Sequence, residues 1–108
     1  MKQGIWISFD LGVRGDYEGL YGWLDAHKAE ECGDSFGHLW YEYEGDLIES
    51  LSKDIEDAID VTKKTRIYVV WRNRDNGKMN GRFIIGRRKA APWAGSAGGA
   101  DDSESDES

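Results

Sequence analysis

The sequence predicts a small α+β protein in which two helices cover one face of a β-sheet. Two segments carry apolar residues at the three- and four-residue spacing of an amphipathic helix, and four carry the alternating or β-branched pattern of a strand. Between the last two of these strands, Asp75-Asn76-Gly77 is the strongest short-range hairpin signal. Because each helix is apolar along one stripe only, both are expected on the same face of the sheet.

The first half of the chain predicts a strand, a helix and a second strand. Residues 4–10 alternate apolar side chains, as a half-buried strand does, at Ile5, Ile7 and Phe9. Asp16 is placed to cap a helix whose apolar stripe is Tyr17, Leu20, Tyr21 and Leu24. Gly19 and Gly22 each weaken this helix by about 1 kcal/mol, so it depends on packing or on a neighbour that approaches closely there. Residues 36–44 form the second strand, with one face made by Leu39, Tyr41 and Tyr43.

The second half predicts another helix and the two strands of the hairpin. Asp46 and Glu49 resemble a capping box at the start of a helix whose stripe is Leu47, Ile48, Leu51, Ile55, Ala58 and Ile59. Strands are expected at residues 66–72 and 81–87. We expect Trp93 to fasten the end of the ordered chain to the body of the protein.

Residues 28–35 leave two arrangements open. If they add a short strand that pairs with residues 36–44, the order is βαββαβ with an extra C-terminal β-strand. That order predicts a ferredoxin-like two-layer sandwich with a mostly antiparallel sheet, which is the fold we expect. If they add no strand, the alternative is a small four-stranded sheet with two crossover connections.

Composition indicates one cytoplasmic domain, residues 1–95, followed by a disordered acidic tail, residues 96–108. The length suits a single domain, and no apolar stretch is long enough to cross a membrane. A lone Cys32 excludes an intrachain disulfide and is typical of a reducing compartment. The tail has five acids and no apolar residue except Ala, so it cannot offset the entropy of ordering. It either solubilises the protein or competes with an anionic ligand for the basic segment.

Charge is distributed in blocks along the chain. Residues 1–62 hold four basic and fifteen acidic side chains, whereas residues 63–95 hold ten basic and one acidic. A basic rim with aromatic neighbours can follow a phosphate backbone while a ring stacks on a base. Alternatively, the acids of the first block neutralise the rim within the molecule. Under the first interpretation the binding residues are Arg66, Arg72, Arg74, Lys78, Arg82, Arg87 and Arg88, with Trp71 or Tyr68 as the stacking ring.

Two weaker patterns do not define a cofactor site. Gly12-x-x-Gly15 follows the first strand, as phosphate-binding loops do. The Lys-Ser/Thr pair that completes such a loop does not follow it. His27, Cys32 and His38 lack a fourth Cys or His at zinc-site spacing. We therefore expect no cofactor.

A resemblance to a known family gives Asp10 a separate interpretation. A strand ending in Ile7-Ser8-Phe9-Asp10 precedes a helix beginning with Asp16–Tyr21, and Thr65–Val70 follows later. These segments, which fall within residues 4–72, resemble in sequence and order the small ferredoxin-like proteins of the CRISPR spacer-acquisition subunit superfamily and its virulence-associated relatives. In that superfamily an Asp at this strand end pairs with its copy across a homodimer axis and holds Mg²⁺ for phosphodiester cleavage. The resemblance thus implies Asp10 as the catalytic and metal-binding residue, with carboxylate oxygen as the ligand that Mg²⁺ prefers.

The residues alone favour a structural role for Asp10, in which its carboxylate accepts hydrogen bonds from the backbone amides of residues 11–15. The function we expect is accordingly that of a small binding module, homodimeric through a sheet edge and without a membrane partner. Its basic hairpin engages an anionic partner, either a nucleic acid or an acidic protein surface. The alternatives are a Mg²⁺-dependent endonuclease and a toxin–antitoxin or phage-type protein-interaction component.

Overall fold

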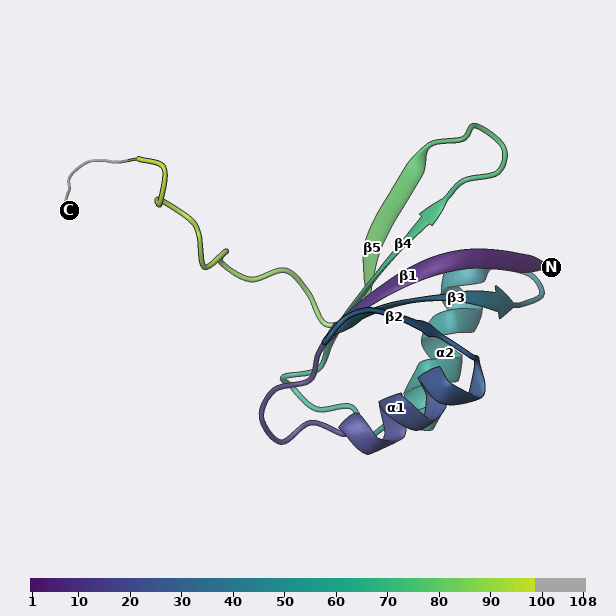
Figure 1. Ribbon diagram of the computed structural model, residues 1–108, viewed down its shortest axis with the longest axis horizontal. Coiled ribbons are helices and arrows are strands. Elements are labelled where there is room, and N and C mark those ends of the chain that lie inside the picture. The colour runs from purple at the N-terminus through teal and green to yellow at the C-terminus, as the bar shows by residue number, and fades with distance from the viewer. Residues whose placement is uncertain (99–108) are drawn as a thin grey trace.

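A computed structural model describes residues 1–98 of the chain. In chain order the elements are β1 (Lys2–Asp10), α1 (Tyr17–Ala26), β2 (Glu30–Gly33), β3 (Phe36–Glu42), α2 (Leu47–Ala58), β4 (Arg66–Arg72) and β5 (Met79–Ile85). The strands form one antiparallel sheet in the order β2-β3-β1-β4-β5, and both helices lie on the same side of β1 and β3 (Figure 1). The expected α+β class with two helices and an antiparallel sheet is confirmed, in an arrangement compatible with a ferredoxin-like sandwich.

The segment that the sequence left open does contain a strand. β2 pairs with β3, with Glu30 opposite His38 and Glu31 opposite Gly37. A register shift follows between Glu31 and Gly33. The sheet therefore has five strands, with the short β2 at one edge and β5 at the other.

The core lies between the sheet and the helices. Alternate residues of the three central strands are buried there: Ile5, Ile7, Phe9, Leu39, Tyr41, Ile67 and Val69. The two helices and the cap of α2 add Leu20, Trp23, Leu47, Leu51, Ile55 and Ile59. Burying one such aliphatic side chain contributes about 1.5–3 kcal/mol, so this layer holds the helices on the sheet.

Trp23, rather than Tyr21, completes the buried stripe of α1. Tyr21 is 51% exposed and Trp23 only 6% exposed. The indole N–H of Trp23 donates a hydrogen bond to Oδ2 of Asp54 on α2 at 3.0 Å. The predicted stripe was wrong at this position because α1 turns partly toward α2 and not only toward the sheet.

Gly19 marks a close approach between α1 and the end of α2. A Cβ at Gly19 would lie 2.8 Å from the carbonyl oxygen of Ala58 and 2.5 Å from Oδ2 of Asp16. A Cβ at Gly22 would have no neighbouring heavy atom within 4 Å. The expected close neighbour is therefore confirmed at Gly19 and not at Gly22.

Asp16 caps α1 and also ties it to the chain beyond α2. Its Oδ1 accepts from the backbone N–H of Gly19 at 2.9 Å, and its Oδ2 accepts from that of Asp60 at 2.9 Å. The Asp60 amide, and after it the Gly19 amide, lower the pKa of Asp16. The charged form of this carboxylate thus stabilises the contact between the two helical segments.

We expect this carboxylate to make stability depend on pH in acid. Because its pKa is lower in the folded chain than in the unfolded chain, its contribution is complete above the unfolded value and is lost as the pH falls through the folded value. Asp16→Asn should therefore reduce the urea midpoint more at about pH 5 than at about pH 2.5. Glu18→Gln, which removes a charge from the same turn but not the cap, is the control. An equal reduction at both pH values would contradict this role for Asp16.

The chain leaves the body of the protein after β5. The hairpin turn closes where the N–H of Asn73 donates to the carbonyl of Lys78 at 2.7 Å, so β5 spans Met79–Ile85 rather than residues 81–87. Gly86 then turns the chain with φ +76°, and the following segment extends away (Figure 1). Trp93 is 73% exposed, so the expectation that it fastens this end to the body was wrong. The predicted disorder of the tail from residue 99 onward lies outside the described residues.

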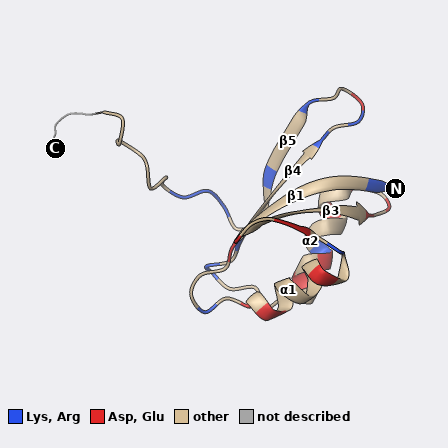
Figure 2. Ribbon diagram, in the orientation of Figure 1, with Lys and Arg blue, Asp and Glu red and all other residues tan. Residues whose placement is uncertain are grey.

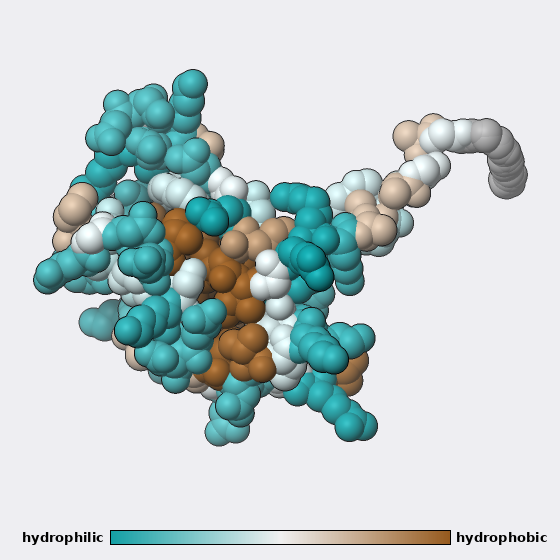
Figure 3. Space-filling model, turned by 180° about the vertical axis from the view of Figure 1, so that it is seen from behind, coloured by the Kyte–Doolittle hydropathy of each residue, from teal (hydrophilic) through white to brown (hydrophobic). Residues whose placement is uncertain are grey.

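One face of the molecule combines an apolar centre with a hydrophilic surround (Figure 3). Figure 3 shows apolar residues at the centre of one face, surrounded by hydrophilic residues that include the turn between β4 and β5. Neither helix within residues 1–98 has the length and apolar character needed to cross a membrane.

Candidate functional site

The face of the sheet that is turned away from the helices carries aromatic and basic side chains. We call this the open face and define it by Trp6, His38, Trp40, Arg66, Tyr68, Val70, Arg72 and Phe83; the register places the acids Asp10, Glu30 and Glu42 on the same side. Trp6 lies opposite His38 on one side and Val70 on the other, and Tyr68 lies opposite Phe83. Directly opposed residues on neighbouring strands point to the same side of a sheet. The strand register therefore gathers rings from four strands on the side of the sheet that neither helix covers (Figure 1).

A groove in the open face is lined by two tryptophans, a histidine and two arginines. The rings of Trp6 and His38 are 4.8 Å apart, and that of Trp40 stands perpendicular to His38 at 5.6 Å. Arg72 and Arg74 complete the lining of a hollow of about 440 Å³. Trp40 is 61% exposed, which leaves one of its faces available to a planar ligand.

Gly4 allows the rings to lie against the backbone of β1. A Cβ at this position would approach Trp40 to 3.1 Å and His38 to 3.2 Å. The missing side chain thus gives the groove its depth, and a larger residue would push both rings outward.

A second aromatic pair lies on β4 and β5. The rings of Tyr68 and Phe83 pack edge-to-face at 4.8 Å. The guanidinium of Arg88 lies 5.8 Å from the centre of Tyr68 and 5.6 Å from that of Phe83, and Arg66 lies 5.8 Å from Phe83. Such cation–π contacts hold the arginines beside the rings without neutralising them. Gly81 makes room for this arrangement, because a Cβ there would meet the Tyr68 hydroxyl at 2.6 Å.

The basic side chains of the hairpin are not neutralised by the acids of the helices. Within residues 1–98, the ion pair of Arg66 with Asp10, at 3.1 Å, is the only one made by a lysine or arginine. Arg72 donates instead to the carbonyl of Gly77 at 3.3 Å. Figure 2 shows acids concentrated on the helices and β2, and most bases on the β4–β5 hairpin, the loops and the segment after β5. Of the ten bases in residues 63–95, Arg66 is the one that pairs with an acid of the first block within the described residues.

The predicted binding arginines divide between the two sides of the sheet. Arg66 and Arg72 lie on the open face. Four further residues flank the hairpin turn or follow β5: Arg74, Lys78, Arg87 and Arg88. Arg82 lies opposite the buried Val69 and so points to the side of the helices.

Trp71 also faces the helices, where it is half-buried against the core. Tyr68 is thus the ring of β4 that shares a face with Arg66 and Arg72. Sequence reasoning did not select Trp6 and Trp40 as site residues. The alternation of apolar residues in β1 and β3 could have identified them, since both tryptophans occupy positions between core residues.

Asp10 is engaged by groups that donate hydrogen bonds. Its Oδ1 accepts from the N–H of Gly12 at 3.2 Å, and its Oδ2 accepts from Nη2 of Arg66 at 3.1 Å. The Gly12 amide, followed by Arg66, lowers the pKa of this carboxyl. A cation at Asp10 would have to displace Arg66, and no cluster of three or more His, Cys, Asp or Glu able to hold a metal occurs among the described residues. The hydrogen bond from Gly12 matches the structural role that the residues alone favoured for Asp10.

Comparison of the chain with protein-family models, with curated proteins and with solved structures gives no match in any of the three. The resemblance of residues 4–72 to the spacer-acquisition superfamily, and the metal role it implies for Asp10, stay expectations.

Proposed function

We propose that this protein is a small ferredoxin-like module that binds single-stranded nucleic acid on its open face. The main support is that the exposed ring of Trp40, the half-buried rings of Trp6 and Tyr68, and arginines that make no ion pair within residues 1–98 share the side of the sheet that neither helix covers. Trp6, Trp40 and Tyr68 offer stacking surfaces, and Arg72 and Arg74 lie beside the first two. Exposed aromatic residues on a sheet stack bases, while neighbouring basic groups contact phosphates.

A single strand is favoured because stacking needs bases whose planar faces are exposed. In a duplex these faces are covered by neighbouring base pairs, so Trp6 and Trp40 would have no partner. An acidic protein surface supplies carboxylates for the arginines but not the regular series of planar bases on which the rings can stack. Acidic proteins and Mg²⁺-dependent cleavage at Asp10 are the alternatives to separate by experiment, and a homodimer through an edge strand also stays a prediction.

Fluorescence anisotropy with labelled oligo(U) and oligo(dT) of about 12 nucleotides tests this function. We expect both single strands to bind more tightly than a duplex of the same length. Affinity should fall as salt rises, with a log–log slope of about −2 to −3 if the arginines neutralise three to four phosphates of a single strand.

Two further measurements separate the alternatives. Polyglutamate carries negative charge without bases and should compete poorly with the oligonucleotides, whereas equal competition would favour an acidic protein partner. Intact oligonucleotide after incubation with Mg²⁺, as with chelator, is the result expected of a binding module. Absence of binding to every oligonucleotide would refute the proposed function.

A further inference from the structure

A second group of basic side chains surrounds a cavity where β1 ends and β4 begins. The cavity has a volume of about 790 Å³. Its charged lining comes from three segments that are far apart in the sequence: Asp10, Arg14, Lys63, Lys64, Arg66 and Lys89. Five of these six side chains are basic, so the cavity concentrates positive charge in a small volume.

Two loops in contact with each other fix part of the wall. Gly12 has a left-handed φ of +79°, and a Cβ there would lie 3.1 Å from Cβ of Lys64. The N–H of Lys64 donates to Oγ1 of Thr62 at 3.2 Å, and the N–H of Thr62 donates to Oγ1 of Thr65 at 2.9 Å. Thr65 is itself only 2% exposed. The backbone that carries Lys64 is thus ordered before a ligand arrives, which lowers the entropic cost of binding.

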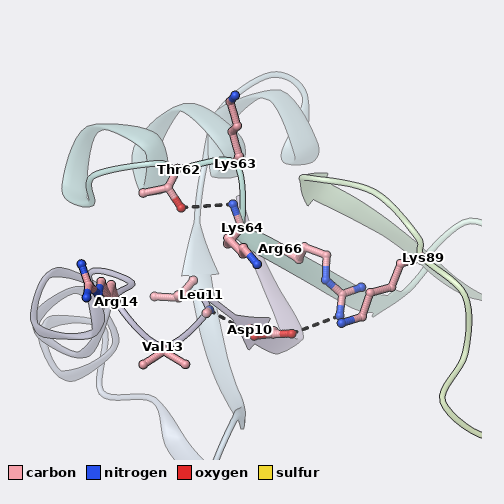
Figure 4. Close-up of a pocket in the computed structure, with 10 residues that line it drawn as sticks. Asp10, Leu11, Val13, Arg14, Thr62, Lys63, Lys64, Arg66 and Lys89 are labelled. Atoms are coloured by element: carbon pink, nitrogen blue, oxygen red, sulfur yellow. Dashed lines mark hydrogen bonds and ion pairs between the residues drawn. The ribbon is translucent and has the colours of Figure 1, made fainter.

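The one carboxylate of the cavity leaves most of the positive charge uncompensated. Asp10 is held by Arg66, and within residues 1–98 four basic side chains of the lining make no ion pair: Arg14, Lys63, Lys64 and Lys89. Figure 4 shows Lys64 and Lys89 on either side of the Asp10–Arg66 pair, whereas Lys63 extends away from it. An anion with more than one negative charge would complete this arrangement.

Arg66 connects the cavity to the open face. Its guanidinium donates to Asp10 inside the cavity and lies 5.8 Å from the ring centre of Phe83 on the open face. A strand stacked over Tyr68 and Phe83 would therefore have its next phosphate near Arg66. We propose that the cavity is a phosphate site that holds the terminal phosphate of a nucleic-acid strand bound on the open face, an inference that rests on the proposed function.

A terminal phosphate fits this cavity better than an internal one. A phosphomonoester carries a charge of about −1.5 to −2 at neutral pH and three acceptor oxygens, whereas an internal phosphodiester carries one charge and continues in two directions. Lys64, Lys89 and Arg66 converge on one region (Figure 4), as the recognition of a single multiply charged group requires.

The test compares oligo(U) strands that carry a 5′-phosphate, a 3′-phosphate or hydroxyls at both ends. We expect one of the phosphorylated strands to bind about tenfold or more tightly than the hydroxyl form. Lys64→Gln and Lys89→Gln should each reduce this advantage and leave the affinity for the hydroxyl form nearly unchanged. Lys53→Gln, on the exposed surface of α2, is the matched control and should keep the advantage. Free pyrophosphate should compete with the phosphorylated strand and remove its advantage.

The outcomes separate this site from the proposed function. Equal affinities for phosphorylated and hydroxyl strands would overturn the phosphate site while strand binding stands. An advantage that survives both Lys64→Gln and Lys89→Gln would place the phosphate elsewhere and would likewise overturn it. Pyrophosphate binding without binding of any oligonucleotide would overturn both the strand as the source of the phosphate and the proposed function.

Discussion

Trp40→Ala is expected to weaken the binding of single-stranded oligo(U) about 5- to 150-fold, the loss expected when one base loses its aromatic stacking partner. Trp40 is suited to this test because it is 61% exposed and contributes little to the core. Trp6→Leu should have an effect of similar size, since leucine keeps an apolar contact with the sheet but offers no ring. Kd values from anisotropy titrations at one fixed salt concentration provide the measurement.

Trp93→Ala is the matched control for both substitutions. Trp93 is also strongly exposed, at 73%, but it lies in the segment that leaves the body (Figure 1). Its removal should leave Kd unchanged. The open face would be excluded as the binding surface if Trp40→Ala and Trp6→Leu both bound the oligonucleotide as tightly as the wild type.

Gly19→Ala should lower the free energy of unfolding by about 1–3 kcal/mol, the usual cost of inserting an atom into a packed contact. The added Cβ would lie 2.8 Å from the carbonyl oxygen of Ala58, which is backbone and cannot rotate away. It would also crowd the capping carboxylate of Asp16. Gly22→Ala, three residues on in the same helix, should instead raise the free energy of unfolding by about 0.5–1 kcal/mol through helix propensity.

Urea unfolding of the two variants, followed by circular dichroism, measures this difference. Both substitutions add the same methyl group to α1, so their helix-propensity gains are similar and the difference reports the contact with α2. If Gly19→Ala stabilised the protein as much as Gly22→Ala, the contact between Gly19 and Ala58 would not restrict the packing of the helices.

Local patterns were sufficient to predict most of the fold. The alternation in residues 4–10, the stripe of α2 and the Asn76-Gly77 turn each depend on neighbours in the sequence, and the structure contains the corresponding elements. β2 remained open because four residues are too few to show a period. Trp23 was missed because its burial depends on how α1 lies against α2, which no pattern within α1 encodes.

The candidate site was harder to predict for the same reason. Alternation showed that Trp40 lies on the side of its strand opposite the core residues, but not that this side is uncovered, which depends on where both helices pack. The cavity depends even more on tertiary structure. Gly12, Lys64 and Lys89 come from three loops or segments, and only the order of the strands brings these together.

The excess of acids on the helices and β2 and of bases on the hairpin and neighbouring loops (Figure 2) separates negative from positive charge within residues 1–98. If the partner is a polyanion, as proposed, it would exert a torque on the protein before the two touch, turning the hairpin toward it and the helices away. Such steering raises the rate of association most at low ionic strength. It also makes the orientation of approach a property of the long-range field, so that neutralising the acids of α2 would lessen the torque without touching the bound complex.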